Sequence, residues 1–537
     1  MSAIRVVGVH PGAELERRPR LFAALSEAFT AVRFEPREAG AWGGLDGLIE
    51  LGGDAEAHAA AAAGVPSLAA LSLELKAGKT NDVLLAEAGL DRRLRGQVLT
   101  DAHMAEWIEV DAPVGAQVLA TVDGRSVWTR TDCLDLVAIS PRELEPGEAL
   151  RARLGRDRSL ALLPLVELLR TLTAGESWQA PPLRATFLLD DPNLHWPSYG
   201  YLKLPRLAHH AAEHEYHLAM AMVPIDARFT HPAAAKLLRE QSSLSLLVHG
   251  NDHLGGELGA IADETRALSV AAQALRRIDA FERRTGVPVS RVMAPPHEQC
   301  SAPMAHALAH TGFDAITMTR PFPWLSAPPR HWLTAPEETG ALPGWGVVDR
   351  GPQGLPVVLR HPFAEGHCSG AELALRAYLG QPLVLYGHHD DLAHGLDVLA
   401  QRSAQVRRMG DVRWCSLSEI AATNVEQRRC GELLRLRPHT RRSEVEIPEG
   451  VRRVVVEPPR GFGPVELVRT PTGTAAVGEP LAVSGPGSLE LRLEVAGAVD
   501  PTGVSPPPWR PWPIARRIAG EARDRAVPVA RRLSVRA

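Results

Sequence analysis

The chain has 537 residues, of which 45% are hydrophobic and 23% are charged. This composition is that of a folded globular protein, and at about 150 residues per domain the length indicates three or four domains and excludes a small disulfide-stabilised fold. The 59 lysines and arginines are outnumbered by 63 aspartates and glutamates, and the resulting net charge of −4 argues against a nucleic-acid-binding protein.

The sequence also contains signals that bear on location. The N-terminal residues lack a basic segment followed by an apolar core, so no secretory signal is predicted. No run approaches the roughly 20 apolar residues that cross a bilayer. The five cysteines are scattered and form no CxxC pair, which is typical of reduced thiols. We therefore expect a cytoplasmic protein.

Residues 1–175 alternate short apolar runs with helical patterns, which predicts an α/β domain with a largely parallel sheet. The segments GLDGLIELGG and VLATVDGRSVW, the second read as a hairpin over Val118–Trp128, resemble the flavodoxin-like fold of class I glutamine amidotransferases. That family needs a cysteine at a glycine-flanked turn between strand and helix, and none of the five cysteines has this context. The resemblance therefore implies a non-catalytic domain with a scaffold or ligand-binding role.

Residues 183–429 alternate strands and helices again, which predicts a TIM-like barrel with fewer than eight strands. A long amphipathic helix is expected at Asp263–Arg284, and the segment RHPFAEGHC, which begins at Arg360, is expected to be a loop whose histidines, His361 and His367, have no function. The predicted strands are ATFLLDD, HLAMAMVP, SLSLLVHG, SRVMAP, AITM and PLVLYGHH.

The last part of the chain changes character. Residues 430–500 contain short β-like runs between Gly/Pro turns, which predicts a small antiparallel β domain. Residues 501–537 form a Pro- and Arg-rich tail, for which we expect a short basic amphipathic helix that Pro513 begins and Pro528 limits to about 14 residues. Such a tail could be solvated, could dock on its own barrel, or could bind weakly to the inner face of the membrane.

Polar side chains lie at the ends of three predicted barrel strands, at Asp190, His249 and His388. The catalytic residues of such barrels lie at these strand ends. Asp190 and Asp191 are adjacent, and like charges at this range call for a cation, unless the pair only caps the turn before Pro192. His249 and His253 follow a second strand, and a loop could bring both imidazoles to one ion, although ordinary surface histidines share this spacing. With Asp191 they would form a facial Asp-His-His site suited to zinc or another first-row metal.

These motifs, ATFLLDDPN, LLVHGNDH and LVLYGHH, occur in the order found in the polysaccharide deacetylases, carbohydrate esterase family four, and this part of the chain resembles that family. The resemblance implies a distorted (β/α)7 barrel and metal-dependent removal of an acetyl group from a carbohydrate or glycan precursor. By the same resemblance, Asp190 would be the general base, and Asp191, His249 and His253 the metal ligands. His388 would be the general acid, with the adjacent His389 as its rival.

The sequence departs from that family in its third motif. Ala294 stands where the family has an arginine that orients the base, and His297 stands where an aromatic residue is usual. His297 could contact substrate or could pack. Trp196 and Tyr199, together with Tyr201, could stack on a sugar ring or could pack the loop against the barrel.

Two other functions remain open. A non-catalytic carbohydrate-binding scaffold is one, because the expected arginine is missing. A metallophosphoesterase is the other, because Gly250-Asn251-Asp252-His253 is similar to a Gly-Asn-His segment of that class, although its other motifs are absent. The expected partner is an acetylated carbohydrate, with no nucleic acid, and the expected cofactor is a divalent metal, most simply zinc.

Overall fold

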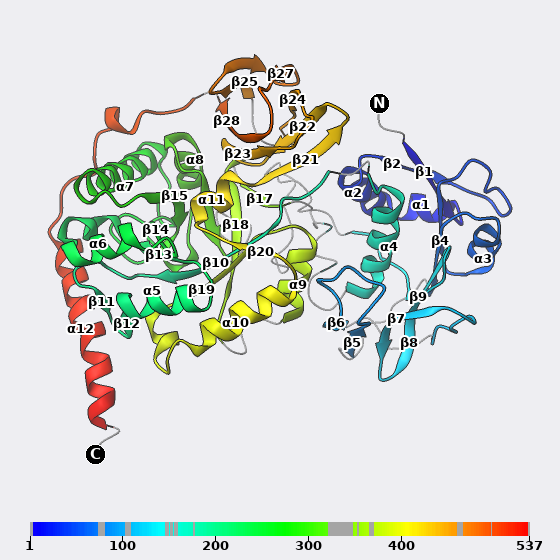
Figure 1. Cartoon of the computed structure of the whole chain (residues 1–537), viewed down its shortest axis with the longest axis horizontal. Coiled ribbons are helices and arrows are strands. Elements are labelled where there is room, and N and C mark those ends of the chain that lie inside the picture. Colours follow the sequence, from blue (N-terminus) through cyan, green and yellow to red (C-terminus); the bar gives the residue numbers. More distant parts are fainter. Residues whose placement is uncertain are drawn as a thin grey trace.

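The structure is a computed structural model. It describes residues 4–72, 81–101, 109–144, 150, 154, 159–175, 178–319, 347–351, 354–364, 370–458, 465–495 and 497–534. Figure 1 shows a central barrel with an N-terminal sheet at one side, a small β unit above it, and a C-terminal helix along the opposite edge. None of the described helices is both long enough and apolar enough to cross a membrane.

The N-terminal sheet combines a parallel half with an antiparallel half, in the order β2-β1-β3-β4-β9-β8-β7-β5-β6. Its five parallel strands follow the flavodoxin-like order 2-1-3-4-5, which confirms the predicted α/β fold. The expected hairpin is β7 and β8, which pair antiparallel. The strands are β1 (Arg5–His10), β2 (Val32–Pro36), β3 (Gly47–Leu51), β4 (Ser67–Ser72), β5 (Asn81–Leu85), β6 (Val98–Asp101), β7 (Gln117–Val122), β8 (Arg125–Arg130) and β9 (Leu134–Ile139), and the helices are α1 (Ala13–Arg17), α2 (Pro19–Ala28), α3 (Ala55–Ala62) and α4 (Ser159–Leu172).

The barrel consists of seven described parallel strands, and the pairing of β10 with β13 closes it. This confirms the predicted (β/α)7 barrel. The barrel strands are β10 (Leu183–Asp190), β13 (Leu218–Met222), β14 (Leu244–His249), β15 (Val289–Ala294), β16 (Ala315–Met318), β18 (Pro356–Pro362) and β19 (Leu383–Gly387). Outside this ring, β20 (Val412–Trp414) pairs with β10, β17 (Asp349–Arg350) pairs with β18, and β11 (Ser198–Tyr199) forms a hairpin with β12 (Leu202–Lys203).

Arg360 and His361 lie within β18, so the prediction of a loop at this position was wrong. The sequence pattern did not predict this strand, because PVVLRHP has only three aliphatic residues before its polar end and a proline at each terminus, a pattern that favours an edge or a turn. Pairing with β16 on one side and β19 on the other makes it an interior strand of the barrel. His367, in the same predicted loop, lies outside the described residues.

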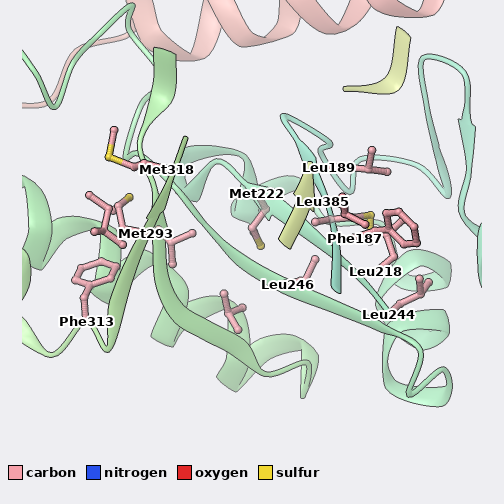
Figure 2. Packing of buried hydrophobic residues seen from close by; sticks show 14 of the residues in the cluster. Phe187, Leu189, Leu218, Met222, Leu244, Leu246, Met293, Phe313, Met318 and Leu385 are labelled. Carbon is pink, nitrogen blue, oxygen red and sulfur yellow. The ribbon is translucent and has the colours of Figure 1, made fainter. Parts of the chain in front are cut away.

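The barrel core explains why its strands read as continuous apolar runs. All eight residues of β10 are buried, because side chains on one face fill the barrel and those on the other face meet the helices. Figure 2 shows part of this packing, in which Phe187 and Leu385 come from neighbouring strands. The surrounding helices are α5 (Leu204–Glu213), α6 (Pro232–Glu240), α7 (Glu264–Thr285), α8 (Ala302–Thr311), α9 (Gly370–Tyr378), α10 (Asp397–Arg408) and α11 (Leu417–Ala422), with 3-10 turns at Pro224–Phe229 (η2), Pro296–Glu298 (η3) and His389–Leu392 (η6).

Helix α7 illustrates how local sequence sets element ends. Asp263 caps its N-terminus by accepting a hydrogen bond from the backbone N–H of Arg266, and Gly286, with a φ of 67°, ends it in the left-handed region. The predicted helix over Asp263–Arg284 is therefore present with nearly the same bounds.

The N-terminal sheet and the barrel share a buried contact. Helix α9 belongs to the barrel, yet Leu375, Tyr378 and Leu379 at its end are part of the N-terminal hydrophobic core. The Tyr378 hydroxyl donates to Glu167 on α4 at 2.5 Å, and the guanidinium of Arg170 lies over the Tyr378 ring at 3.7 Å. These contacts connect the two units through α9 and α4.

The C-terminal β unit contains two described four-stranded sheets packed around one hydrophobic core. Most neighbouring strands are antiparallel, as predicted, but β22 and β24 pair in parallel. The strands are β21 (Val425–Cys430), β22 (Leu433–Pro438), β23 (Arg442–Ile447), β24 (Arg453–Val456), β25 (Val465–Thr470), β26 (Gly473–Ala476), β27 (Pro480–Ala482) and β28 (Gly487–Val495).

The tail forms one long helix, α12 (Trp512–Ser534), which follows a short 3-10 turn, η7 (Pro501–Gly503). The expectation that Pro528 ends the helix was wrong, because α12 continues past it. A proline removes one backbone hydrogen bond and crowds the preceding turn, which a helix can tolerate at a cost, as α4 does at Pro164. Helix α12 contacts β11 and η2, so the tail docks on its own barrel.

Candidate metal centre

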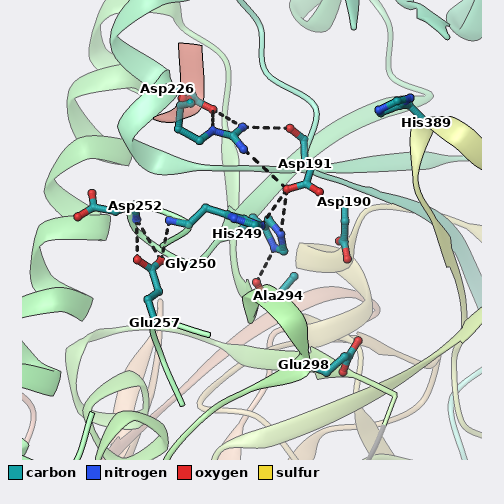
Figure 3. Close-up of polar contacts among 12 residues, drawn as sticks. Asp190, Asp191, Asp226, His249, Gly250, Asp252, Glu257, Ala294, Glu298 and His389 are labelled. Carbon is teal, nitrogen blue, oxygen red and sulfur yellow. Dashed lines mark hydrogen bonds and ion pairs between the residues drawn. The ribbon is translucent and has the colours of Figure 1, made fainter. Parts of the chain in front are cut away.

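Three predicted ligand residues meet at the carboxyl ends of the barrel strands. Asp191 follows β10, His249 ends β14, and His253 lies in the loop after β14. The Asp191 Oδ1 atom lies 3.0 Å from Nε2 of His253 and 3.5 Å from Nε2 of His249. Figure 3 shows the carboxylate of Asp191 directed toward His249. A single ion could contact one atom from each of these residues, since all three atoms lie within 4.8 Å of one another.

The orientation of His249 fits a cation at this position. Its Nδ1 atom lies 2.8 Å from the carbonyl oxygen of Ala294, which can only accept, so Nδ1 carries the proton. In the neutral imidazole, Nε2 then presents a lone pair toward Asp191. The Asp191 Oδ1 atom is itself buried and accepts no hydrogen bond of good geometry from the described residues. An oxygen and two nitrogens arranged in this way match the donor set of zinc and similar divalent metals.

The pKa shifts of the cluster also indicate that positive charge is favoured beside its carboxylates. Burial alone would raise the pKa of Asp191, but the imidazoles of His249 and His253 outweigh it and hold that pKa far below its ordinary value. Burial would lower the pKa of His249, yet Asp190 and Asp191 raise it above its ordinary value. Protons on the imidazoles and a bound cation are alternative ways to neutralise these two carboxylates.

Glu257 holds the loop that carries His253. Its carboxylate accepts hydrogen bonds from the backbone N–H groups of four consecutive residues, Asn251 to Leu254, at 2.6 to 3.4 Å. Figure 3 shows Glu257 below this turn. Such a concave row of N–H groups around an anion fixes the backbone and therefore the direction of the His253 side chain. No sequence motif predicted this role for Glu257. The one available indication was its position four residues after His253, a candidate ligand.

Backbone strain is concentrated at the site. Six non-glycine residues among those described have positive φ, and four of them lie here: Asp191 at 75°, and His253, His297 and Glu298 at 55° each. Left-handed conformations of this kind cost about 1–3 kcal/mol each and persist where surrounding contacts enforce them, most often at functional sites.

Asp190 points into a separate buried contact. Its Oδ1 atom accepts a hydrogen bond from Nη1 of Arg360 at 2.9 Å, and the same guanidinium donates to Oε1 of Glu298 at 2.6 Å. Arg360 is 2% exposed and Asp190 is 3% exposed. Burial alone would raise the pKa of Asp190, but Arg360 and His249 hold it below its ordinary value. The residue beside the predicted base is therefore an arginine on β18.

This contact can be compared with the departure noted at Ala294. The sequence lacks an arginine at the expected place on β15, and Ala294 instead supplies the carbonyl oxygen that orients His249. The cation that faces Asp190 comes from another strand. Arg360 follows an apolar run, as the polar residues at the other strand ends do, and this position could have predicted its role. The prolines on either side of the run made a strand there difficult to predict.

The two late histidines differ in their surroundings. His388 is exposed, and its imidazole contributes to the low pKa of Asp190. His389 is buried and packs against the rings of Tyr199 and Tyr201, with centroid distances of 5.2 and 6.0 Å. Figure 3 shows His389 apart from the Asp191 cluster. His388 therefore acts electrostatically on Asp190, whereas His389 packs within the loop.

The predicted aromatic contacts also separate. Tyr199 is buried, and its hydroxyl donates to Asp524 of α12 at 2.7 Å. Trp196 is exposed and stacks on His231, with ring centroids 5.5 Å apart. His297 lies beside the cluster, with its ring centroid 5.4 Å from that of His253. Burial, followed by the neighbouring His253, lowers the pKa of His297.

A cavity of about 370 Å³ opens over the cluster, and helix α12 forms one wall of it. Asp191, Tyr199 and His253 contribute from the barrel. From α12, Arg517 pairs with the buried Asp226 at 2.5 Å and lies 3.9 Å from Oδ1 of Asp191. The cavity has the size of a small-molecule site.

Fold and site together define a (β/α)7 barrel with an Asp-His-His cluster, suited to a divalent metal, at the carboxyl ends of its strands. No known protein family and no curated protein match the sequence.

Among solved structures, part of the chain is similar to a polysaccharide deacetylase candidate from Mycobacterium smegmatis, with a TM-score of 0.30 and 16% identity, over 46% of this chain and 95% of that one. A mutant of a carbohydrate esterase family four pseudoenzyme with restored enzymatic activity matches with a TM-score of 0.28 and 10% identity, over 45% of this chain and 69% of that one. A family four esterase from Streptococcus mutans matches with a TM-score of 0.26 and 10% identity, over 44% of this chain and 87% of that one. Because these scores are low, we base the functional proposal on the geometry of the site.

Proposed function

We propose that the barrel is a metal-dependent hydrolase that removes an acetyl group from a carbohydrate or glycan precursor. The observation that carries this proposal is the convergence of Asp191, His249 and His253 beside a second carboxylate, Asp190, that does not share their contacts. One carboxylate is thereby available for metal and the other for proton transfer. A metal held by the three ligands would polarise the acetyl carbonyl and lower the pKa of a bound water.

Asp190 is suited to accept the proton of the attacking water. Arg360 favours its ionised form, so the carboxylate is a base at neutral pH despite its burial. Arg360 also fixes the direction of the carboxylate by a hydrogen bond to one oxygen, which leaves the other oxygen available. Arg360 thus has the positioning role that the missing arginine on β15 would have had.

His388 is suited to protonate the leaving amine. It follows β19, which pairs with β10, so it lies at the same end of the barrel as Asp190. Its exposure allows proton exchange with solvent between turnovers. We assign His389 to packing, because it is enclosed by Tyr199 and Tyr201.

The other functions have less support. A two-metal phosphoesterase needs ligands for a second ion about 3.5–4 Å from the first, and the described residues hold a single candidate cluster. The non-catalytic scaffold was suggested by the missing arginine, and the contact between Arg360 and Asp190 removes that reason.

The test is acetate release from a panel of N-acetylated and O-acetylated sugars by the full chain, with and without a chelator. We expect release that stops on chelation and returns with zinc or another divalent metal. Asp190→Asn should abolish release while the protein keeps its metal. Full activity after exhaustive chelation, or in Asp190→Asn, would contradict the proposal.

A further inference from the structure

Helix α12 docks on the barrel with its charged face. Arg517 pairs with Asp226, Glu521 with His195, and Asp524 accepts a hydrogen bond from Tyr199. These three contacts recur at intervals of three or four residues, which is the spacing of one helix face. The negative charges of α12 are therefore turned toward the barrel.

The opposite face of α12 is apolar and exposed. Trp512 is 66% exposed and Ile518 is 55% exposed, and Trp509 just before the helix is 75% exposed. The alanines between them on this face, Ala515, Ala522 and Ala526, are exposed as well, whereas Ala519 lines the cavity over Asp191. A surface helix normally has the reverse arrangement, with its apolar face on the core and its polar face in water.

Further exposed aromatic residues of the barrel lie beside this helix. Trp196 is 53% exposed and lies under the guanidinium of Arg525, at 5.8 Å. Phe229 is 48% exposed and contacts the ring of His195, which in turn bonds to Glu521. Figure 1 shows α12 along the outer edge of the barrel, on the side away from the N-terminal sheet. The apolar surface therefore extends from α12 onto the neighbouring segments of the barrel that carry Trp196 and Phe229.

We propose that this surface, made of Trp196, Phe229, Trp509, Trp512 and Ile518, binds the surface of an anionic lipid bilayer. The charge of the tail supports this occupant over a second protein. The segment from residue 509 to 537 has eight arginines against two acidic residues, and both acidic residues face the barrel. Arg516 and Arg523 are exposed and add positive charge beside the apolar face; both also line the cavity over Asp191, and Arg516 donates to the carbonyl oxygen of His253 at 3.1 Å. Tryptophans between arginines are typical of helices that lie in the interface of anionic membranes.

The consequence concerns access to the site. Helix α12 lies between the proposed bilayer contact and the cavity over Asp191 and His253, so bound protein would hold this cavity beside the lipid headgroups. The inference goes beyond the proposed hydrolysis and is tested without any substrate, so it can fail or succeed independently of that activity.

The test is co-sedimentation of the full chain with vesicles of phosphatidylcholine, alone or mixed with phosphatidylglycerol. The test variant combines Trp512→Ser and Ile518→Ser, and the matched control combines Leu84→Ser and Val98→Ser, which are similarly exposed on the N-terminal sheet. We expect the wild type and the control to bind mixed vesicles at low salt, and the test variant to bind about tenfold more weakly or less. Binding should be lost at about 1 M salt, where the Debye length is about 3 Å.

Three results would overturn the proposal: no binding by the wild type at low salt, equal binding to neutral vesicles, or equal binding by the test variant. Size-exclusion chromatography without lipid adds a fourth. If the test variant converts a dimer into a monomer, the face covers a second copy of the chain instead of a bilayer.

Discussion

Replacing Arg360 by methionine isolates the contribution of the cation that faces Asp190. The guanidinium makes hydrogen bonds of 2.9 Å to Asp190 and of 2.9 and 2.6 Å to Glu298, and it is almost fully buried. Removing one member of such a buried group leaves uncompensated charge and costs about 3–5 kcal/mol of stability. Lysine cannot bridge both carboxylates, so Arg360→Lys should recover only part of this loss.

The same change should move the pH dependence of activity. Without Arg360, burial raises the pKa of Asp190 with less opposition, so the base becomes protonated at a higher pH. The acidic limb of kcat/KM should shift to higher pH, and activity at pH 7 should fall within the range of about 10²- to 10⁴-fold that a general base contributes. The loss of stability has the matching sign. It should be largest at neutral pH and should shrink as pH falls toward the low pKa of Asp190 in the wild type.

The assays are acetate release across pH and denaturant unfolding at neutral and acidic pH. The matched control is Arg184→Met, because Arg184 is also buried in the barrel but donates to the neutral Asn424 at 2.8 Å, away from the cluster. Arg184→Met should reduce stability without moving the acidic limb. An unchanged limb in Arg360→Met, or the same shift in both variants, would refute the reasoning.

Three further predictions follow from single contacts. His253→Ala should reduce bound divalent metal from about one ion per chain to a small fraction, whereas Asp190→Asn should retain it; equal metal loss, by elemental analysis, would contradict their separate roles. Glu257→Ala should weaken metal affinity about 10- to 100-fold in a chelator competition, because the loop that carries His253 loses the carboxylate that accepts its backbone hydrogen bonds. An unchanged affinity would show that Glu257 is not needed to fix the conformation of this loop. Tyr378→Phe should lower the free energy of unfolding by about 1–3 kcal/mol, since Glu167 loses its donor, and an unshifted melting curve would argue against that contact.

The order of strands and helices could be predicted from the sequence because their hydrophobic patterns are local. Apolar runs such as SLSLLVHG end in polar residues, and parallel strands place those ends at one rim of a barrel. This is why Asp191, His249 and His253 could be grouped from the sequence by itself. The alternation of strands and helices and the bounds of α7 follow from the same periodicity, whereas the (β/α)7 barrel and the flavodoxin-like fold were expected from the family resemblances.

Only the tertiary structure decided which charges meet. Arg360 pairs with Asp190 across 170 positions, and Arg517 pairs with Asp226 across 291. No local pattern encodes such pairs, because each partner by itself resembles an ordinary polar residue at the end of an element. The tail shows the same limit: its sequence predicted an amphipathic helix, but its face toward the barrel was set by buried partners on β11 and η2. A charged face can dock only where opposite charges lie, and that complementarity exists only once the chain is folded.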